Sequence, residues 1–425
     1  MSPDESQHLS ETGPGTAMGE LLRRFWVPAL LSSELAAGGA PVRVRLFSEN
    51  LVAFRTSEGK VGLFGENCAH RGASMYYGQN GRGGLRCWYH GWKYDVDGNC
   101  LETPNEPNDN LQKRVRQKAY PCVEKNGAVW TYMGQRDSMP PMPDLEWLKV
   151  EENQVFVSKR IQQCHWTQGM EGDLDPRHLA FLHAGTIDDT AEHAGHASAD
   201  WLKQDLTPIL EAVVKPAGLM FAARRNADAN SYFWRVGQWM IPFFTTIPAF
   251  PGAGPLAGHA WVPADEGRTT VFTFNWHPTR ALSNGELTMM RSGTAMHAAL
   301  IPGTFTPVCN KDNDYAGPDS PPAPQPWMRI KRFQDQDICI TESIGPGYNR
   351  TEENLGSSDA VIGRVRATLM AAARDLRDGK EPPGRDPAEF RMRPISVQLP
   401  RSTTAWADEI ADAVDTRPET FRASV

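Results

Sequence analysis

The chain reads Cys-Ala-His at residues 68–70 and Cys-Trp-Tyr-His at residues 87–90, and the sixteen residues 71–86 separate the two stretches. Each stretch offers one thiolate and one imidazole. A glycine follows each of them, Gly72 after the first and Gly91 after the second. Glycine lets backbone amides approach a bound group closely. The two matched stretches therefore predict a metal site held at the tips of two loops.

Two cysteines and two histidines are the ligands of a Rieske [2Fe–2S] cluster, in which the cysteines hold one iron and the histidines hold the other. We expect Cys68 and Cys87 to bind the inner iron. We expect His70 and His90 to bind the outer iron. A structural zinc site is the alternative, because two cysteines and two histidines are also a zinc ligand set. Zinc modules usually pair cysteine with cysteine and histidine with histidine, so the mixed halves favour the cluster.

Length and charge limit the class of protein. A chain of 425 residues can form two or three domains with cores of their own. The formal net charge of −7 gives no indication of a nucleic-acid partner. No stretch approaches the roughly 18 apolar residues of a membrane span, and residues 1–7 form neither a basic leader nor an apolar run. We therefore expect a soluble, cytoplasmic protein that binds neither nucleic acid nor membrane.

Turn-forming residues divide the first third of the chain into short strands. Between residues 40 and 140, short stretches of alternating apolar and polar residues are separated by glycines, which predicts a small all-β domain over 40–140. Residues 1–39 are predicted to be an N-terminal helical segment, with one short helix over residues 19–26 that Pro28 stops. The proline-rich residues 139–143 mark the predicted domain boundary.

Residues 141–425 are predicted to form a second domain with mixed elements. Residues 208–275 are rich in valine and aromatic residues with glycine and proline breaks, which favours a large antiparallel sheet. Residues 286–300 are predicted to be helical. A further helix is predicted to begin at a cap formed by Ser358 and to end before Gly379. The fold class expected for the whole chain is α+β.

Acidic residues and two histidines gather between Glu171 and His183. On a helix, His178 and His183 would point about 140° apart, so they bind one ion only if the helix bends or ends between them. A buried imidazole without a metal is the alternative for either histidine alone. Two histidines and one carboxylate form the facial triad of non-heme Fe(II) oxygenases, which leaves open positions for O₂ and substrate. The pair therefore predicts a mononuclear iron site.

Several carboxylates are candidates for the third ligand of this site. Asp175, three residues before His178, is better placed to accept a hydrogen bond from an imidazole N–H. The late acidic segment offers Asp335, Asp337 and Glu342. Periodicity does not choose among these three, and each is also typical of a helix surface.

Taken together, the Cys-X-His, Cys-X-X-His and Asp-X-X-His-X₄-His motifs and the late acidic segment resemble a known family. They are similar to the oxygenase component of Rieske non-heme iron ring-hydroxylating oxygenases, in the phthalate dioxygenase-like branch. Residues 13–26, 91–98 and 336–356 extend the resemblance over nearly the whole chain. The resemblance implies an all-β Rieske domain at residues 40–140. It implies a helix-grip catalytic domain, an antiparallel sheet with helices, at residues 141–425.

The resemblance also implies the ligands and the electron path. It assigns the third ligand of the mononuclear iron to Asp337, and it makes Asp175 the link between a cluster histidine of one subunit and an iron histidine of its neighbour. Transfer between subunits implies a homotrimer or a stacked pair of trimers. A reductase of the flavin or ferredoxin type would bring electrons from NADH to the [2Fe–2S] cluster. From there they would pass through Asp175 to the mononuclear Fe(II), where O₂ meets the substrate.

The class of substrate follows from the same resemblance. Members of this branch typically act on aromatic carboxylates, which an arginine binds through two parallel hydrogen bonds. Arg224, Arg225 and Arg235 are the candidates, and at most one of Arg224 and Arg225 points inward because neighbouring strand residues face opposite sides. His165, where the family commonly has asparagine, is a candidate pocket residue. Residues 258–261 contain no arginine, which favours a benzoate-like or phenoxybenzoate-like acid over phthalate.

These features predict a terminal oxygenase that hydroxylates an aromatic carboxylate, with dihydroxylation of the ring as the expected reaction. A monooxygenase or an O-demethylase that acts on a methoxylated or substituted aromatic acid is the first alternative. A Rieske electron carrier without oxygenase activity is the second, but it needs only the domain that carries the cluster. His178, His183 and the long second half of the chain favour the oxygenase.

Overall fold

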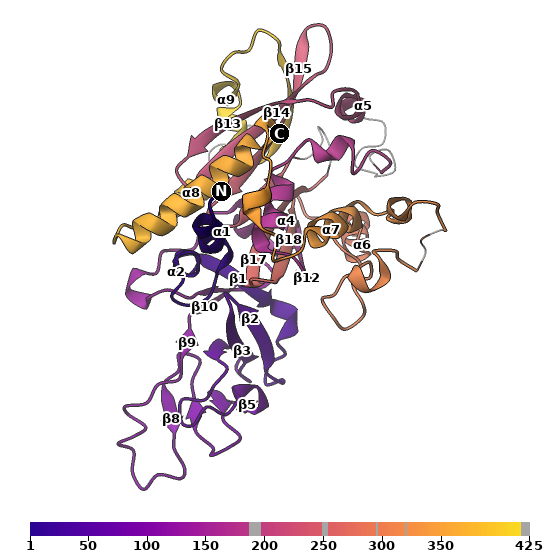
Figure 1. Ribbon diagram of the computed structural model, residues 1–425. Coiled ribbons are helices and arrows are strands. Elements are labelled where there is room, and N and C mark those ends of the chain that lie inside the picture. The colour runs from indigo at the N-terminus through magenta and orange to yellow at the C-terminus, as the bar shows by residue number, and fades with distance from the viewer. Residues whose placement is uncertain (187–196, 249–253, 295, 319, 321, 418–425) are drawn as a thin grey trace. The chain divides into compact units, whose positions relative to one another are not determined.

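The computed structural model describes residues 1–186, 197–248, 254–294, 296–318, 320 and 322–417 (Figure 1). The chain divides into two compact units. The smaller unit comprises Thr12–Met139 and Pro263–Asp265, and the larger unit comprises Met1–Glu11, Pro140–Val262 and Glu266–Val425. The first eleven residues therefore belong to the larger unit.

Short antiparallel strands make up most of the smaller unit. They are β1 (Trp26–Leu31), β2 (Val42–Leu46), β3 (Glu49–Arg55), β4 (Val61–Gly65), β5 (Gln79–Gly81), β6 (Gly84–Arg86), β7 (Lys93–Tyr94), β8 (Cys100–Glu102), β9 (Ala119–Tyr120), β10 (Cys122–Lys125) and β11 (Ala128–Tyr132). They form three sheets with the orders β1-β11-β10, β2-β3-β4-β9 and β5-β6-β7-β8. The alternation in the sequence of β2 is reflected in its burial, because Val44 and Leu46 are buried and the two arginines between and before them are not.

The start of the smaller unit differs from the predicted helix over residues 19–26. The helix α2 spans Ala17–Leu22, and the side chain of Thr16 accepts a hydrogen bond from the N–H of Gly19 at its start. Strand β1 then begins at Trp26 and includes Pro28. This strand stands at the edge of its sheet, and its pairing with β11 is irregular between Pro28 and Leu30. An edge strand tolerates proline because one side of it makes no ladder hydrogen bonds.

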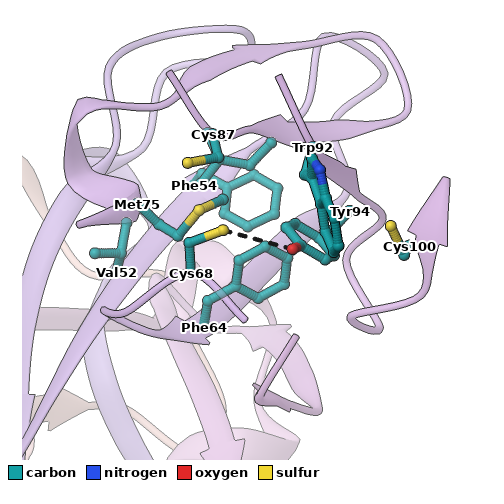
Figure 2. Packing of buried hydrophobic residues seen from close by; sticks show 10 residues of the cluster. Val52, Phe54, Phe64, Cys68, Met75, Cys87, Trp92, Tyr94 and Cys100 are labelled. Carbon is teal, nitrogen blue, oxygen red and sulfur yellow. Dashed lines mark hydrogen bonds between the residues drawn. The ribbon is translucent and has the colours of Figure 1, made fainter. Parts of the chain in front are cut away.

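A buried core underlies the two loops that carry the cysteine–histidine motifs (Figure 2). The rings of Phe54 and Phe64 meet edge to face with centroids 4.8 Å apart, and the rings of Phe64 and Tyr94 do so at 6.4 Å. Cys68 and Cys87 belong to the same core. The loops therefore rest on close-packed aromatic side chains, which hold the cysteines in place.

One large antiparallel sheet forms the centre of the larger unit. Its strands are β12 (Val155–Gln162), β13 (Ile209–Lys215), β14 (Gly218–Asn226), β15 (Ser231–Met240), β16 (Phe244–Ile247), β17 (Leu256–Asp265), β18 (Arg268–Trp276) and β19 (Ile395–Pro400). The order is β12-β18-β17-β16-β15-β14-β13, and β19 also pairs with β15. The sheet expected over residues 208–275 therefore forms, with additional strands from both sides of that range.

Helices accompany this sheet (Figure 1). They are α1 (Pro3–Ser10), α3 (Glu146–Lys149), α4 (Trp166–Asp173), α5 (Ala197–Gln204), α6 (Asn284–Arg291), α7 (Phe333–Ile344), α8 (Ala360–Arg377), α9 (Trp406–Glu409) and α10 (Ala411–Val414). Helix α4 packs against β16 and α7. A Cβ added at Gly169 of α4 would lie 2.2 Å from the ring of Trp261 in β17, so α4 lies directly on the sheet.

Two predicted helices can be compared with the structure. Helix α8 ends as predicted, at Arg377 before Gly379 with its positive φ of 83°, but the predicted cap is wrong, because the N-cap is Asp359 and Ser358 lies in the short 3₁₀ turn Ser357–Asp359 before the helix. The helix expected at residues 286–300 is shorter, because α6 ends at Arg291 and Gly293 has a φ of 73° that turns the chain away. Among the described helices, none has both the length and the apolar character needed to cross a membrane.

Candidate metal centres

The two cysteine loops of the smaller unit have the same backbone conformation. In each loop the cysteine N–H donates to the carbonyl of the residue five positions later, and the N–H of the glycine four positions later donates to the cysteine carbonyl, at distances of 2.7 to 3.0 Å. Both glycines have positive φ, 74° at Gly72 and 75° at Gly91. Residues with a Cβ rarely adopt this conformation, which explains why glycine follows both motifs. The matched loops present Cys68 and Cys87 in equivalent positions.

The two cysteine side chains are buried, with 3% of each exposed. Burial raises the pKa of the Cys87 thiol, and the neighbouring Cys68 adds to this effect. A raised pKa means that ionising the buried thiol is unfavourable. A bound metal would offset this cost, because it binds and stabilises the thiolate. The hydroxyl of Tyr94 lies 3.5 Å from Sγ of Cys68 (Figure 2). Hydrogen bonds to cluster sulfurs are one of the factors that set the potential of an iron–sulfur centre.

The two histidine side chains lie at the half-exposed rim of the same loops. The rings of His70 and His90 are 4.6 Å apart between centroids, and the ring of His70 stacks on Trp92 at 4.2 Å with an angle of 4° between planes. Burial lowers the pKa of His70, as do the nearby His90 and Arg71. Neutral imidazoles are the form that binds metal. Buried thiols beside half-exposed imidazoles fit a [2Fe–2S] cluster whose histidine-bound iron faces outward.

In the larger unit, His178 and His183 approach one carboxylate. Nε2 of His183 lies 3.0 Å from Oδ1 of Asp337, and Nε2 of His178 lies 3.8 Å from the same atom. One potential ligand atom from each of the three residues lies within 4.8 Å of the others. A metal about 2.1 Å from ligands at right angles would separate them by roughly 3 Å. The three side chains therefore fit a metal ion bound as a facial triad.

The backbone between the two histidines explains how they converge. Helix α4 ends at Asp173, and the next helical turn is the short 3₁₀ segment His178–Ala180. The residues after it turn without forming a helix. This is the break between the histidines that convergence requires.

Neighbouring side chains fix the orientation of the triad. Oε1 of Gln336 lies 2.8 Å from Nδ1 of His183, so Gln336 accepts the Nδ1 proton and leaves the Nε2 lone pair toward Asp337. The ring of Phe333 stacks on His183 at 3.6 Å. Sequence reasoning did not single out Gln336, although its place directly before Asp337 is a usable signal. Oδ2 of Asp175 lies 3.7 Å from Nδ1 of His178, beside it but beyond direct hydrogen-bond distance.

The other two acidic candidates of the late segment lie elsewhere in α7. Burial raises the pKa of Asp335, and the thiol of Cys309 lies near its carboxyl group. Glu342 accepts hydrogen bonds from the N–H of Gln163 at 2.8 Å and from the hydroxyl of Tyr315 at 2.9 Å. Among the residues that the structure describes, Asp337 is the member of this group that joins the histidines.

The three candidate arginines are placed differently. Arg224 lies over the rings of Tyr232 and Trp234, at 4.5 and 5.5 Å. Arg225 is buried, and its guanidinium donates to the carbonyls of Pro176 at 2.8 Å and Asp205 at 3.3 Å. Its Nη1 makes no hydrogen bond within the described part of the chain. Burial lowers the pKa of Arg225 to about 10, with a smaller opposing contribution from the carboxylate of Asp205.

Arg235 lies in the strand beside Arg225. Its pairing partner across the strands is Ala223, which places Arg235 on the same face of the sheet as Arg225. Its Nη2 donates to the carbonyl of Pro248 at 2.8 Å. Burial lowers the pKa of Arg235 to about 9, and the positive charge of Arg225 adds to this effect.

His165, the fourth candidate pocket residue, lies at the start of α4 as its cap. Its Nδ1 lies 2.9 Å from Nη2 of Arg350 and 2.8 Å from the hydroxyl of Thr167, and its Nε2 lies 3.2 Å from the carbonyl of Ser10. Burial and the charge of Arg350 lower the pKa of His165 to about 3. Both ring nitrogens are thus engaged by the protein. The structure does not bring His165 together with the three candidate substrate-binding arginines or with the triad.

Comparisons with known proteins identify the two parts of the chain in which these candidate centres lie. The family model described as "Rieske [2Fe-2S] domain" matches residues 25–121, and the model described as "LigXa C-terminal domain like" matches residues 131–406. The oxygenase subunit of 3-chlorobenzoate-3,4-dioxygenase from Comamonas testosteroni is 35% identical over 410 residues, which cover 92% of this chain and 93% of that protein. The oxygenase subunit of phthalate 4,5-dioxygenase from Pseudomonas putida is 32% identical, covering 94% and 92%.

A solved structure supports the fold alone. The terminal oxygenase of carbazole 1,9a-dioxygenase from Nocardioides aromaticivorans IC177 superposes with a TM-score of 0.61 at 17% identity, covering 88% of this chain and 98% of that one. An all-β domain with a Cys/His cluster motif, followed by an antiparallel sheet with a His/His/Asp group, defines a Rieske-type oxygenase.

The chain belongs to the Rieske non-heme iron ring-hydroxylating oxygenases, as an oxygenase component similar to those of phthalate and chlorobenzoate dioxygenases. The predicted family and the α+β fold with a Rieske and a catalytic domain are confirmed. The protein is an oxidoreductase whose family uses a Rieske [2Fe–2S] cluster and a mononuclear iron.

Proposed function

We propose that this chain is the terminal oxygenase of a system in which a separate reductase carries electrons from NADH, and that it hydroxylates an aromatic monocarboxylate with O₂. The two relatives named above are oxygenase subunits of dioxygenases of chlorobenzoate and phthalate. The observation that carries the proposal for this chain is a buried arginine, Arg225, that hydrogen-bonds the segment holding the candidate iron ligands.

Each group of ligands has a distinct role in this proposal. When bound, the cluster supplies electrons one at a time and the mononuclear iron activates O₂. His178, His183 and Asp337 hold the iron, and Gln336 keeps Nε2 of His183 free to bind it. Cys68, Cys87, His70 and His90 hold the cluster. Dihydroxylation of the ring is the reaction that the dioxygenase relatives favour.

The buried positive charge of Arg225 makes this residue a suitable partner for the carboxylate of the substrate. Its hydrogen-bond acceptors are the backbone carbonyls of Pro176 and Asp205, which are neutral. A buried cation without a directly bound carboxylate is costly, and an incoming carboxylate would offset that cost through two charge-assisted hydrogen bonds. The carbonyl of Pro176 lies two residues before His178, so a carboxylate at Arg225 would be bound next to the iron loop. Arg235, on the same face, adds positive charge there.

The test compares two neighbouring arginines. We expect Arg225→Gln to raise KM for aromatic acids by roughly 10- to 150-fold, because losing a hydrogen bond to a charged group costs about 1.5–3 kcal/mol. Arg224→Gln is the matched control, since Arg224 stacks on Tyr232 and Trp234 instead. The measurement is O₂ uptake with a reductase, NADH and a panel of substituted benzoates. Iron content should be the same in both variants.

Two results would contradict the role of Arg225. One is an unchanged KM in Arg225→Gln at full iron content. The other is an equal rise of KM in Arg224→Gln, which would point to a general disturbance of β14. Uptake that requires a neutral aromatic compound, with no response to any acid, would contradict the proposed substrate class itself.

A further inference from the structure

Trp92 contacts both of the loops that carry the candidate cluster ligands. Its carbonyl accepts a hydrogen bond from the N–H of Cys87 at 2.7 Å, within its own loop. Its indole ring stacks on His70, which belongs to the other loop, with 4.2 Å between ring centroids and 4° between planes. One residue therefore contacts a candidate ligand of the inner iron through its backbone and a candidate ligand of the outer iron through its side chain.

The two matched loops differ at this position. In the first loop the N–H of Cys68 donates to the carbonyl of Ala73, five residues later, as the N–H of Cys87 donates to the carbonyl of Trp92 in the second. Ala73 and Trp92 thus occupy equivalent backbone positions. Alanine has no ring to stack on a histidine, so the first loop offers His90 no counterpart of the contact that Trp92 makes. The equivalent backbones therefore carry two inequivalent histidines.

The ring next to His90 is of a different kind. It belongs to Tyr89, the residue directly before it, and it lies 3.8 Å away between centroids with a tilt of 42°. The side chain of Tyr89 is 59% exposed, whereas that of Trp92 is 2% exposed. A ring that is fixed in the core restricts its partner, while an exposed ring of the same loop moves with that loop. His70 is therefore the more firmly held of the two histidines.

Packing and one hydrogen bond fix the indole of Trp92. The ring belongs to the buried core beneath the loops, together with Tyr94 (Figure 2). Its Nε1 donates to Oδ1 of Asn105 at 2.8 Å. A buried tryptophan N–H usually has such a partner. Asn105 itself is exposed, so it can be replaced without opening the core.

The flat contact with Trp92 sets the plane of the His70 ring. An imidazole binds a metal through a lone pair that lies in the plane of the ring, so the orientation of this plane decides where the metal is held. The rings of His70 and His90 lie 4.6 Å apart at an angle of 69°. Two imidazoles at such an angle can approach one iron from different directions. Groups that orient metal ligands contribute about 10- to 100-fold to metal affinity or activity.

The same contact has an electrostatic consequence. The face of an indole ring is negative, and among the aromatic side chains tryptophan attracts a cation most strongly. An imidazole carries more positive charge when it is bound to Fe(III) than when it is bound to Fe(II). The neutral histidines make the outer iron easier to reduce than an iron held by thiolates. The indole on His70 therefore stabilises the oxidised cluster more than the cluster that has gained one electron, which lowers the reduction potential.

We propose that Trp92 is a positioning residue for the outer iron of the cluster, which fixes the plane of His70 and lowers the reduction potential of the cluster. Asn105 acts through Trp92, because it holds the indole ring in place. The inference concerns the delivery of electrons and goes beyond the proposed function. It does not depend on which acid is the substrate.

The test uses three variants of the full chain and one control. Trp92→Leu removes the stacked ring, Trp92→Phe keeps a ring with a less negative face, and Asn105→Ala removes the acceptor of the indole N–H. Trp88→Leu is the matched control, because it removes a tryptophan of the same loop that is 72% exposed. The measurements are iron and sulfide content, the EPR spectrum after dithionite reduction, and the reduction potential from a redox titration.

We expect Trp92→Leu to retain the cluster, to shift the g values of the reduced signal and to raise the equilibrium constant of reduction at least threefold. This change corresponds to about 28 mV for one electron. Trp92→Phe and Asn105→Ala should give smaller shifts of the same sign, and Trp88→Leu should leave the potential and the g values unchanged. A purely structural role would lower the cluster content without moving the potential of the clusters that remain.

Two results would overturn the role of Trp92. One is a wild-type potential and wild-type g values in Trp92→Leu at full cluster content. The other is a shift of equal size in Trp88→Leu. If Trp92→Leu assembles no cluster, the other two variants decide, and a wild-type potential in both Trp92→Phe and Asn105→Ala contradicts the proposal.

Discussion

Replacing Asp337 by alanine should remove the mononuclear iron, leave the cluster intact and reduce O₂ uptake by more than about 100-fold, since even outer-shell partners of metal ligands are worth about 10- to 100-fold. Oδ1 of Asp337 lies between Nε2 of His183 and Nε2 of His178, at 3.0 and 3.8 Å. Its loss leaves two neutral ligands and no charge to balance the ion. Iron per chain should fall from about three to about two.

The matched control for this variant is Asp335→Asn. Asp335 lies two residues earlier in the same helix, and burial beside Cys309 raises its pKa, so a neutral amide of the same shape should be tolerated. Iron content and activity should both be retained. Loss of the third iron in Asp335→Asn, or its retention in Asp337→Ala, would show that the ligand had been assigned to the wrong carboxylate.

Asp175→Asn should keep both metal centres and yet slow turnover by at least about 100-fold. We propose that Asp175 connects a cluster histidine of one subunit to His178 of the next in a homotrimer or a stacked pair of trimers. Oδ2 of Asp175 lies 3.7 Å from Nδ1 of His178, and Oδ1 accepts from the N–H of Arg177 at 2.8 Å. An amide of the same shape preserves packing but loses the charge that the link between the two imidazoles requires.

The measurement for Asp175→Asn is stopped-flow reoxidation of the reduced cluster in the presence of substrate and O₂. The cluster should reoxidise normally with an artificial acceptor and slowly with O₂, at unchanged iron content. Sedimentation of the same samples compares the oligomeric state of the variant with that of the wild-type protein. Normal turnover in this variant would refute the bridging role, and loss of iron or of the trimer would make the residue structural instead.

Features that depend on residues close together in the chain could be predicted from the sequence. The motif ending in His70 and the motif ending in His90 are each completed by a glycine whose positive φ closes the loop. The spacing of His178 and His183 already required a break in the helix between them, and the structure has one. The end of α8 followed from Gly379, whereas the predicted cap, Ser358, is one residue away from the observed N-cap, Asp359.

Features that depend on contacts between residues far apart in the chain could not be predicted from the sequence. Periodicity could not separate Asp337 from Asp335, because the choice depends on how α7 packs against His183, more than 150 residues earlier. Strand alternation predicted that at most one of Arg224 and Arg225 points inward, and the burial of the side chains shows that Arg225 is the inward one. A hydrogen bond between the side chains of Asp173 and His259 joins residues 86 positions apart and has no local signal.

The most direct test of the central claim is metal analysis of the wild-type protein, purified without air and with iron retained, together with visible and EPR spectra before and after dithionite. We expect about three irons per chain, two in the cluster and one in the triad, and a rhombic signal of the reduced Rieske cluster. About two irons per chain with that signal would indicate either an electron carrier or a protein that has lost its mononuclear iron. A colourless protein that contains zinc and does not respond to dithionite would contradict both metal centres.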